Sequence, residues 1–349
     1  MTRRRARALL MALAPALCLV ACDDGELPPV TWHGEHVEFG AAPTLTPCAG
    51  TVDHLDRFAA FVKRELGDAE LDAPPVPLLW VHDDVLDARC PELSGGCFDG
   101  DVALASSRAF EHELVHALLH QPYGDTYPLL AEGAAELLDD DFALAARDTP
   151  RLDPRTMLDG ELPNYTTAGD LAAHLLSRYG PERLIALYDA LSYRDSERRV
   201  RRRFAEIYGR SLDEVAEEFL AGPRCEDAVY PVRSFLCDSP RVAWEGARWS
   251  YTRVPACDEP DVRGDADGAR ATSVTLDIPS PGEHRVRWVI DERASAVLVS
   301  CSGCPWVPRY TLTGASELVL ELDEGPYVLW LQVEDPLLRR VGVSIEPER

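Results

Sequence analysis

The chain has 349 residues, of which 46% are hydrophobic, so it is long enough to bury more than one core. Its formal net charge of −25 argues against nucleic acid as a partner, because a strongly acidic surface repels the phosphate backbone. The composition says nothing about the oligomeric state.

Residues 1–21 have the pattern of an export signal. The opening stretch MTRRRARA carries four arginines, and the apolar segment LLMALAPALCLV that follows is too short to span a bilayer. The four residues that end at Cys22, Leu-Val-Ala-Cys, resemble a bacterial lipobox, in which cleavage leaves the Cys22 thiol to carry lipid. We therefore predict a lipoprotein of the cell envelope, anchored to a membrane through its acyl chains; the inner or the outer membrane stays open. The alternative is a plain secretory signal with an incidental cysteine.

Eight further cysteines fit a protein that folds in an oxidising compartment, and four disulfides are the default expectation. Three of the eight precede residue 225 and five lie at or after it, so complete pairing needs an odd number of bridges between the two parts. The pair Cys301-Ser-Gly-Cys304 also matches a redox or zinc motif, but no second matching pair lies nearby, and structural bridging is favoured. The eight cysteines are Cys48, Cys90, Cys97, Cys225, Cys237, Cys257, Cys301 and Cys304.

Residues 22–47 are rich in proline and have no sustained periodicity, which predicts a tether between the lipid and the folded protein. Apolar periodicity then predicts alternating helices and strands, and Gln121-Pro-Tyr-Gly is a stop signal for the second helix. In chain order these elements are a helix at 51–66, strands at 77–82 and 101–105, a helix at about 108–120, and a helix that opens at Pro128.

Residues 166–221 are predicted to be almost entirely helical. Gly180-Pro181 ends one helix and opens the next, and Ser211-Leu-Asp-Glu214 is a capping box. The run of arginines at 198–203 could grip an acidic substrate or form a solvated, ion-paired helix face. In so acidic a chain the ion-paired face is favoured.

After residue 240 the apolar period changes to two, with turns such as Pro-Gly and Asp-Glu-Gly between the runs. This pattern predicts a β-sandwich over 241–349. It resembles the small jelly-roll domains at the C-termini of many secreted bacterial peptidases in size, position and strand pattern. Together with a mixed domain over 48–224 and a cysteine-containing linker over 225–240, the predicted fold class is α+β.

Residues 112–116, HELVH, are either metal ligands or ordinary side chains of a buried helix. On a helix, His112 and His116 lie one turn apart on the same side, opposite an apolar stripe that includes Leu114 and Leu118. That spacing lets two imidazole nitrogens reach one zinc ion, and Glu113 can take a proton from metal-bound water. Because the motif also arises by chance, it is only suggestive without a third ligand.

A zinc hydrolase needs a third protein ligand and an open position for water. His120 is the nearest candidate, but it lies about 12 Å along the helix axis from His112, too far to share one ion. In the next predicted helix, Glu132 and Glu136 lie on one face of an apolar segment, where a carboxylate is costly unless it meets a cation. The intervening residues suffice for a turn and an antiparallel return, and Gly133 would let the two helices approach closely.

The motifs HELVHALL and Pro-Leu-Leu-Ala-Glu-Gly-Ala-Ala-Glu, with Ala168-Gly169 opening a helix that ends at Tyr179-Gly180, resemble the gluzincin metallopeptidases of the MA-type superfamily. The resemblance covers about residues 50–222 and is closest to bacterial members with an H-E-x-x-H…A-E-G-x-A-E arrangement. It implies a zincin-like metallopeptidase domain with a small N-terminal sheet, an active-site helix and a helical C-terminal part.

By this resemblance the zinc ligands would be His112, His116 and Glu132, and Glu113 would be the general base. Glu136 matches the family's acidic position that orients a zinc-bound histidine by hydrogen bonding.

The resemblance leaves one role without a clear match in this chain. Tyr165 is the candidate for stabilising the oxyanion, and a structural role is its alternative. The expected function is zinc-dependent hydrolysis of a peptide or protein substrate by metal-activated water. The competing hypothesis is an inactive zinc-binding envelope lipoprotein that acts as a binding or assembly module.

Overall fold

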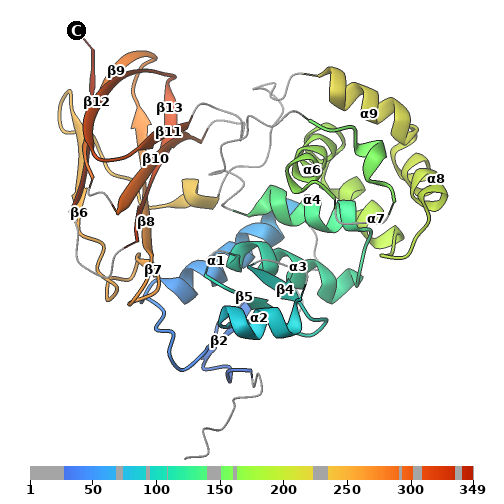
Figure 1. The fold of residues 1–349 in the computed structure, drawn as a ribbon. Helices are drawn as coiled ribbons and strands as arrows, with labels where there is room; N and C mark the ends of the chain where they lie inside the picture. The colour runs from blue at the N-terminus through green and yellow to red at the C-terminus, as the bar shows by residue number, and fades with distance from the viewer. Residues whose placement is uncertain are drawn as a thin grey trace, which may run out of the picture.

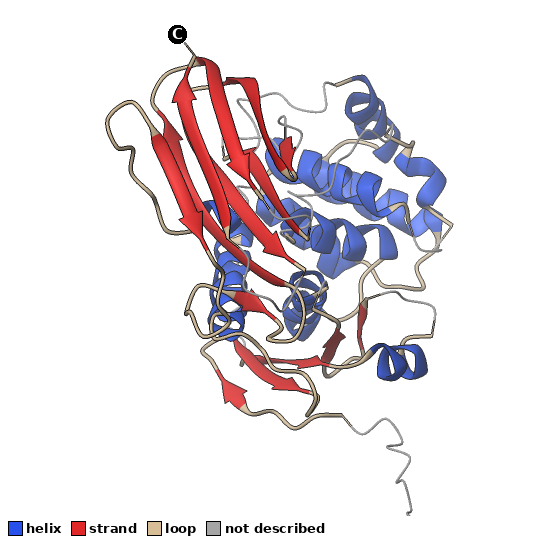
Figure 2. Ribbon diagram, turned by 60° about the vertical axis from the view of Figure 1, so that its left-hand side comes forward, coloured by secondary structure: helices blue, strands red, loops and turns tan. Residues whose placement is uncertain are grey.

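Helices and a small sheet form the N-terminal part of the computed structural model, and antiparallel strands form the C-terminal part (Figures 1 and 2). The chain is therefore α+β, as predicted. The predicted signal peptide, 1–21, and Cys22 lie outside the described residues. The structure describes residues 27–67, 74–91, 95–107, 109–139, 151–159, 163–222, 235–290, 293–301, 309–334 and 340–348.

The sheet of the N-terminal part has five strands in the order β1-β2-β3-β5-β4. Its three central strands are parallel, and both edge strands are antiparallel to their neighbours. The strands are β1 (Trp32–His33), β2 (Val37–Ala41), β3 (Val76–Trp80), β4 (Gly96–Phe98) and β5 (Ala103–Ala105).

Both faces of this sheet are covered. Leu78 and Trp80 lie in a core shared with helices α1 (Thr51–Leu66) and α3 (Phe110–Tyr123), whereas Leu79 packs in a second cluster with Leu86 of α2 (Asp83–Arg89). A parallel strand that is buried on both faces has a continuous apolar run instead of an alternating one. The run at β3 was recognisable in the sequence for this reason.

The prediction that residues 22–47 form a tether is wrong for the described part of that segment. Strands β1 and β2 lie within it, and Val37 and Phe39 are buried. The Asp56 carboxylate on α1 accepts hydrogen bonds from the backbone N–H groups of His36 (2.7 Å) and Val37 (3.0 Å). Strand β2 escaped sequence analysis because it is short and pairs with a parallel strand far along the chain.

The helical prediction for residues 166–221 is confirmed, including the capping box between Ser211 and Glu214. Helix α3 continues through Pro122, past its predicted end near His120, and closes at Gly124, whose N–H bonds the His120 carbonyl at 2.7 Å. Within the described residues, no helix is both long and apolar enough to cross a bilayer. The remaining helices are α4 (Pro128–Leu138), α6 (Tyr165–Tyr179), α7 (Pro181–Ala190), α8 (Glu197–Tyr208) and α9 (Leu212–Ala221), with short 3-10 turns η2 (Pro154–Met157) and η3 (Phe235–Asp238).

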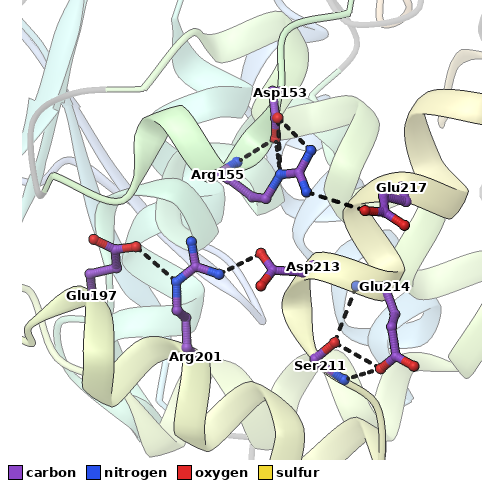
Figure 3. Close-up of polar contacts among 8 residues, drawn as sticks. All are labelled: Asp153, Arg155, Glu197, Arg201, Ser211, Asp213, Glu214 and Glu217. Atoms are coloured by element: carbon purple, nitrogen blue, oxygen red, sulfur yellow. Dashed lines mark hydrogen bonds and ion pairs between the residues drawn. The ribbon is translucent and has the colours of Figure 1, made fainter.

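The arginine run at 198–203 forms an ion-paired, solvated helix face, as favoured by the sequence. Figure 3 shows Arg201 of α8 between Glu197 on its own helix (2.8 Å) and Asp213 of α9 (2.6 Å). In the same region Arg155 of η2 reaches Glu217 of α9 at 3.7 Å. These pairs are half exposed, so each adds little stability, and together they fix the relative positions of neighbouring helices.

Gly133 allows a close helix contact, but with α6 and not with α3 as predicted. A Cβ atom at this position would lie 2.7 Å from the Ala168 carbonyl oxygen and 3.3 Å from the Ala172 side chain. The small residues of α6 therefore meet a glycine of α4, and the two helix backbones approach closely. This contact determines where the polar face of α4 points.

The C-terminal part is a β-sandwich, in agreement with the period-two pattern. Its two antiparallel sheets have the orders β11-β10-β13-β8-β7 and β12-β9-β14-β6, and side chains from both sheets form one apolar core around Trp249. The strands are β6 (Trp249–Arg253), β7 (Arg263–Gly264), β8 (Arg270–Ile278), β9 (Gly282–Val289), β10 (Ala294–Ser300), β11 (Arg309–Leu312), β12 (Ala315–Leu322), β13 (Gly325–Val333) and β14 (Val341–Pro347).

Three disulfides occur in the described part of the chain. Cys48–Cys257 joins the two parts of the protein, Cys90–Cys97 closes a short loop, and Cys237–Cys301 fastens η3 to the sandwich. One of the three crosses between the parts, in line with the odd number expected, and Cys301 serves a structural bridge instead of a redox motif. Cys225 and Cys304 lie outside the described residues.

The chain before α1 pairs with the sandwich through its backbone as well. The N–H of Cys48 bonds the Gly264 carbonyl at 2.8 Å, and the N–H of Gly50 bonds the Val262 carbonyl at 2.9 Å. The Thr51 hydroxyl and the Gly264 backbone form two further hydrogen bonds, of 3.0 and 3.2 Å. The start of α1 is therefore hydrogen-bonded to strand β7 and the residue before it.

Gly133→Ala should lower the free energy of unfolding by about 1–3 kcal/mol, because the new methyl group meets a backbone carbonyl that cannot move aside cheaply. At an uncrowded helix position the same change would stabilise the protein by about 1 kcal/mol. Urea unfolding measures the sign directly. Ala131→Gly on the same helix gives the contribution of helix propensity, and a stabilised Gly133→Ala protein would contradict the close contact with α6.

Candidate metal centre

Helix α3 carries the HELVH segment with its apolar side anchored in the core. Phe110, Leu114 and Leu118 are all buried among the residues that cover the sheet. His112 and His116 lie on the other side and are partly exposed, with ring centroids 4.9 Å apart. The amphipathic pattern predicted from the sequence therefore holds, and it turns both imidazoles toward α4.

Helix α4 brings Glu132 to the two histidines. The Nε2 atoms of His112 and His116 lie 3.2 Å apart, and the Glu132 Oε2 atom lies 3.3 Å from the first and 3.5 Å from the second. The three donor atoms thus form a nearly equilateral triangle, and these residues are a group that could hold one metal ion. The fold therefore brings together the three predicted ligands, two from α3 and one from α4.

The electrostatics of the triangle show paired charges. Burial raises the pKa of Glu132, but hydrogen bonds from His112 and His116 outweigh burial and hold it at about 2. Burial lowers the pKa of His112, and the hydrogen bonds that His112 donates to Asp139 and Glu132 outweigh that effect, so the net shift is upward. Without a metal ion, the proton held by His112 compensates the Glu132 charge; a cation could do the same.

Glu113 lies beside the triangle. Its side chain is buried, and burial raises the pKa of its carboxyl group, against the lowering effect of His116 and His112. A Cβ atom on Gly96 of the edge strand β4 would lie 2.5 Å from Glu113 Cγ and 2.9 Å from Oε1. Only a glycine there leaves room for this carboxylate between α3 and the strand.

Asp139, at the C-terminal end of α4, was missed by sequence analysis. Its carboxylate oxygen lies 3.2 Å from His112 Nδ1. It accepts a hydrogen bond from that nitrogen and leaves Nε2 facing Glu132. Glu136, predicted for this kind of role, offers an oxygen within 4.8 Å of donor atoms on both His112 and Asp139. The sequence signal for Asp139 was an acidic residue three positions after Glu136, at the end of the same predicted helix.

Tyr165 lies near the triangle, and His120 lies outside it. The Tyr165 ring lies 5.9 Å from the His112 ring. Burial, followed by the charges of Glu132 and Glu113, raises the Tyr165 pKa, so the hydroxyl keeps its proton. His120 pairs with Asp125 at 3.1 Å and does not belong to the triangle.

A second polar group lies immediately behind α3 and was not anticipated. His54 Nε2 of α1 is 2.8 Å from Glu111 Oε1, and Arg263 of strand β7 contacts both residues. Burial lowers the pKa of His54 to about 4, while the hydrogen bond from His54 outweighs burial at Glu111 and lowers its pKa to about 2. Neutral His54 therefore lies between a guanidinium and a carboxylate. The only sequence signal was a histidine within the apolar stripe of the first helix.

Comparison with known proteins adds little to this geometry. No family model matches the chain, and no curated protein matches it. Among solved structures, it is similar to the pre-peptidase C-terminal domain of collagenase from Bacillus anthracis, at 11% identity over 31% of this chain and 93% of that one, with a TM-score of 0.22. It is also similar to PliG, a periplasmic inhibitor of g-type lysozyme. The Salmonella Typhimurium protein gives 15% identity over 31% and 98% of the two chains (TM-score 0.21), and the Aeromonas hydrophila protein 12% over 31% and 95% (TM-score 0.20).

The metal-free protein should lose stability as the pH falls from 6.5 toward 4.5, and His54 should carry much of this loss. Its folded-state pKa of about 4 lies below the ordinary 6.5, so the unfolded chain binds the proton more readily in this range. The upward shift of His112 acts above pH 6.5, and Glu111 and Glu132, at about 2, act below 4.5. Within the window, His174, whose pKa burial lowers, adds to the loss, and Glu113, whose pKa burial raises, opposes it. The expected loss is about 2–3 kcal/mol. Urea unfolding of His54→Gln should show a shallower dependence on pH; an unchanged slope would exclude His54 as its source.

Asp139→Asn should weaken metal binding by about 10–100-fold, because His112 loses the carboxylate that orients its ring. Glu136→Gln should have a smaller effect, since it leaves the Asp139 hydrogen bond in place. Zinc titration against a competing chelator measures both variants. A larger loss for Glu136→Gln than for Asp139→Asn would assign the orienting role to Glu136, as the sequence predicted.

Proposed function

We propose that the protein is a zinc metallopeptidase of the gluzincin type, with a zincin-like domain over residues 48–224. The observation that carries this proposal is the triangle of donor atoms on His112, His116 and Glu132, with sides of 3.2, 3.3 and 3.5 Å. Ligands about 2.0–2.1 Å from a tetrahedral zinc ion are separated by about 3.3 Å, so the triangle has the dimensions of one face of such a site.

The chemistry of the donors also favours zinc. Two neutral imidazole nitrogens and one carboxylate oxygen form a common ligand set for catalytic zinc, and three protein ligands leave a fourth position open. The Asp139 hydrogen bond to His112 Nδ1 selects the tautomer that leaves Nε2 free for a metal. Zinc bound there would supply the Lewis acidity that makes water a nucleophile near neutral pH.

We assign the proton transfers of hydrolysis to Glu113. It is the neighbour of one ligand in α3, and its raised pKa suits a group that takes a proton from the attacking water and returns it to the leaving amine. Tyr165, close to the His112 ring, is the candidate for donating a hydrogen bond to the developing oxyanion. We assign these roles as part of the proposal.

A polypeptide is the substrate that the surroundings favour. Strand β4 is the edge of its sheet, and its backbone at Gly96 packs directly against Glu113. An extended peptide could add to that edge by main-chain hydrogen bonds, which would bring its carbonyl groups past the general base. The Cys90–Cys97 disulfide links β4 to the end of α2.

The proposal includes lipid anchoring at Cys22 and location in the cell envelope. The described fold begins at Leu27, which packs with Val30 against the cluster that contains Leu79. Four residues between Cys22 and Leu27 span at most about 18 Å when extended, so the anchor would hold the domain close to the membrane. The substrates would then be envelope polypeptides within reach of that surface.

A second candidate function is an inactive zinc-binding envelope lipoprotein that acts as a binding or assembly module. The observation that favours it is the surroundings of the Tyr165 hydroxyl, where burial and the charge of Glu132 raise its pKa, because a hydroxyl that faces a ligand carboxylate is a poorer donor to an oxyanion. Zinc binding without cleavage of any peptide in a broad library would support this alternative.

Glu113→Gln should keep the fold and the bound zinc but reduce peptide cleavage by roughly 10³-fold, because the amide cannot accept the proton of water. Digestion of a peptide library by wild type and variant, with and without chelator, measures this change, and zinc content is determined on the same samples. Glu206→Gln on the exposed face of α8 is the matched control and should cleave like wild type. Equal cleavage by Glu113→Gln and wild type would remove Glu113 from its assigned role.

A further inference from the structure

A charged side chain of the sandwich, Arg263, contacts the N-terminal part of the protein at α1 and at the first turn of α3. Arg263 lies on the two-residue strand β7, and its Nη1 atom is 3.0 Å from His54 Nδ1 and 3.6 Å from Glu111 Oε1. His54 Nε2 lies 2.8 Å from the same Glu111 oxygen. A residue of the C-terminal part therefore contacts the residue that precedes the ligand His112.

His54 lies between the Arg263 guanidinium and the Glu111 carboxylate. With its lowered pKa, His54 is neutral near pH 7, so one ring nitrogen donates and the other accepts. Arg263 Nη1 contacts both ring nitrogens, and Nε2, the nearer of the two, also contacts Glu111, so the three groups form one cluster. The result is a continuous path from β7 through α1 to the first turn of α3.

The group is buried, so its members depend on one another. The exposed fractions of the side chains are 15% for Arg263, 10% for His54 and 17% for Glu111. A carboxylate in such surroundings needs a compensating charge, and the Arg263 guanidinium lies 3.6 Å from the Glu111 carboxylate. Loss of the guanidinium would favour a shift of Glu111 toward solvent, and Glu111 cannot move far without its helical neighbour.

Other contacts already join the two parts of the protein. The Cys48–Cys257 disulfide and the hydrogen bonds between Thr51 and Gly264 hold β7 against the start of α1. None of these touches α3. Arg263 is different because it extends the interface to the helix that carries two of the three donor atoms.

We propose that Arg263 is a positioning residue for the metal centre: through His54 and Glu111, the sandwich holds the first turn of α3 where His112 and His116 can meet Glu132. This inference rests on the proposed metal site and deepens it, because it makes the C-terminal sandwich a part of that site's support. Metal affinity would then depend on a residue in another part of the chain.

Arg263→Gln tests the proposal, with Thr51→Val as the matched control. The control removes hydrogen bonds from the same strand to the same helix but leaves Glu111 and His54 in place. Arg263→Gln should raise the dissociation constant for Zn²⁺ roughly tenfold and change the visible absorption spectrum of the protein loaded with Co²⁺. Thr51→Val should leave both within about twofold of wild type. Equal losses in the two variants would reduce Arg263 to an ordinary interface residue and overturn the proposal.

A double-mutant cycle tests whether the effect passes through Glu111. Glu111→Gln should weaken Zn²⁺ binding by itself, and adding Arg263→Gln to that background should produce little further loss. Fully additive losses would show that Arg263 acts independently of Glu111 and would contradict the path.

Hydrogen exchange on the metal-free protein separates this inference from the proposed function. Arg263→Gln should speed amide exchange over residues 110–116 at least severalfold relative to wild type, whereas Thr51→Val should not. If wild type fails to bind Zn²⁺, the proposed function is wrong, and the exchange comparison still decides whether Arg263 holds α3. Unchanged exchange in Arg263→Gln would overturn the inference whatever the zinc result.

Discussion

Two imidazoles and one carboxylate lie with their donor atoms no more than 3.5 Å apart, and the helices around them must be held in place for this to occur. Helix α3 is anchored by its apolar side over the sheet, and α4 is held against α6 at Gly133. Metal–ligand distances tolerate deviations of only a few tenths of an ångström, so a small shift of either helix would separate the donors. The packing of two helices is thus a condition for any chemistry at this site.

Charge compensation is the second constraint. Several carboxylates gather around α3 in a strongly acidic chain, and three of those described pair with a histidine. Glu132 and Asp139 face His112, while Glu111 faces His54 and Arg263. Buried charges without such partners would cost several kcal/mol each, so the acidic residues are tolerated because the histidines and one arginine are placed among them.

The two parts of the protein meet at the start of α1 and, through Arg263, at Glu111 in the first turn of α3. A disulfide, backbone hydrogen bonds and Arg263 join them there. The sandwich is thereby connected to the helix that carries the histidines, which gives it a structural connection to the site besides any role in binding a partner. The sequence predicted a linker at residues 225–240 between the two parts, and that prediction gave no sign that the sandwich contacts α3.

The sequence by itself determined what local patterns encode: the helix that carries His112, Glu113 and His116, the third donor on the following helix, and the period-two strands of the sandwich. These signals are short in range, because helix and strand periodicities and fixed motif spacings act over a few residues. Only the tertiary structure decided which residues support the donors. Asp139, Gly133 and the His54–Arg263 contact, 209 residues apart in sequence, depend on how separate elements pack. No local pattern encodes such contacts, because each side chain acquires its partner only when the chain has folded.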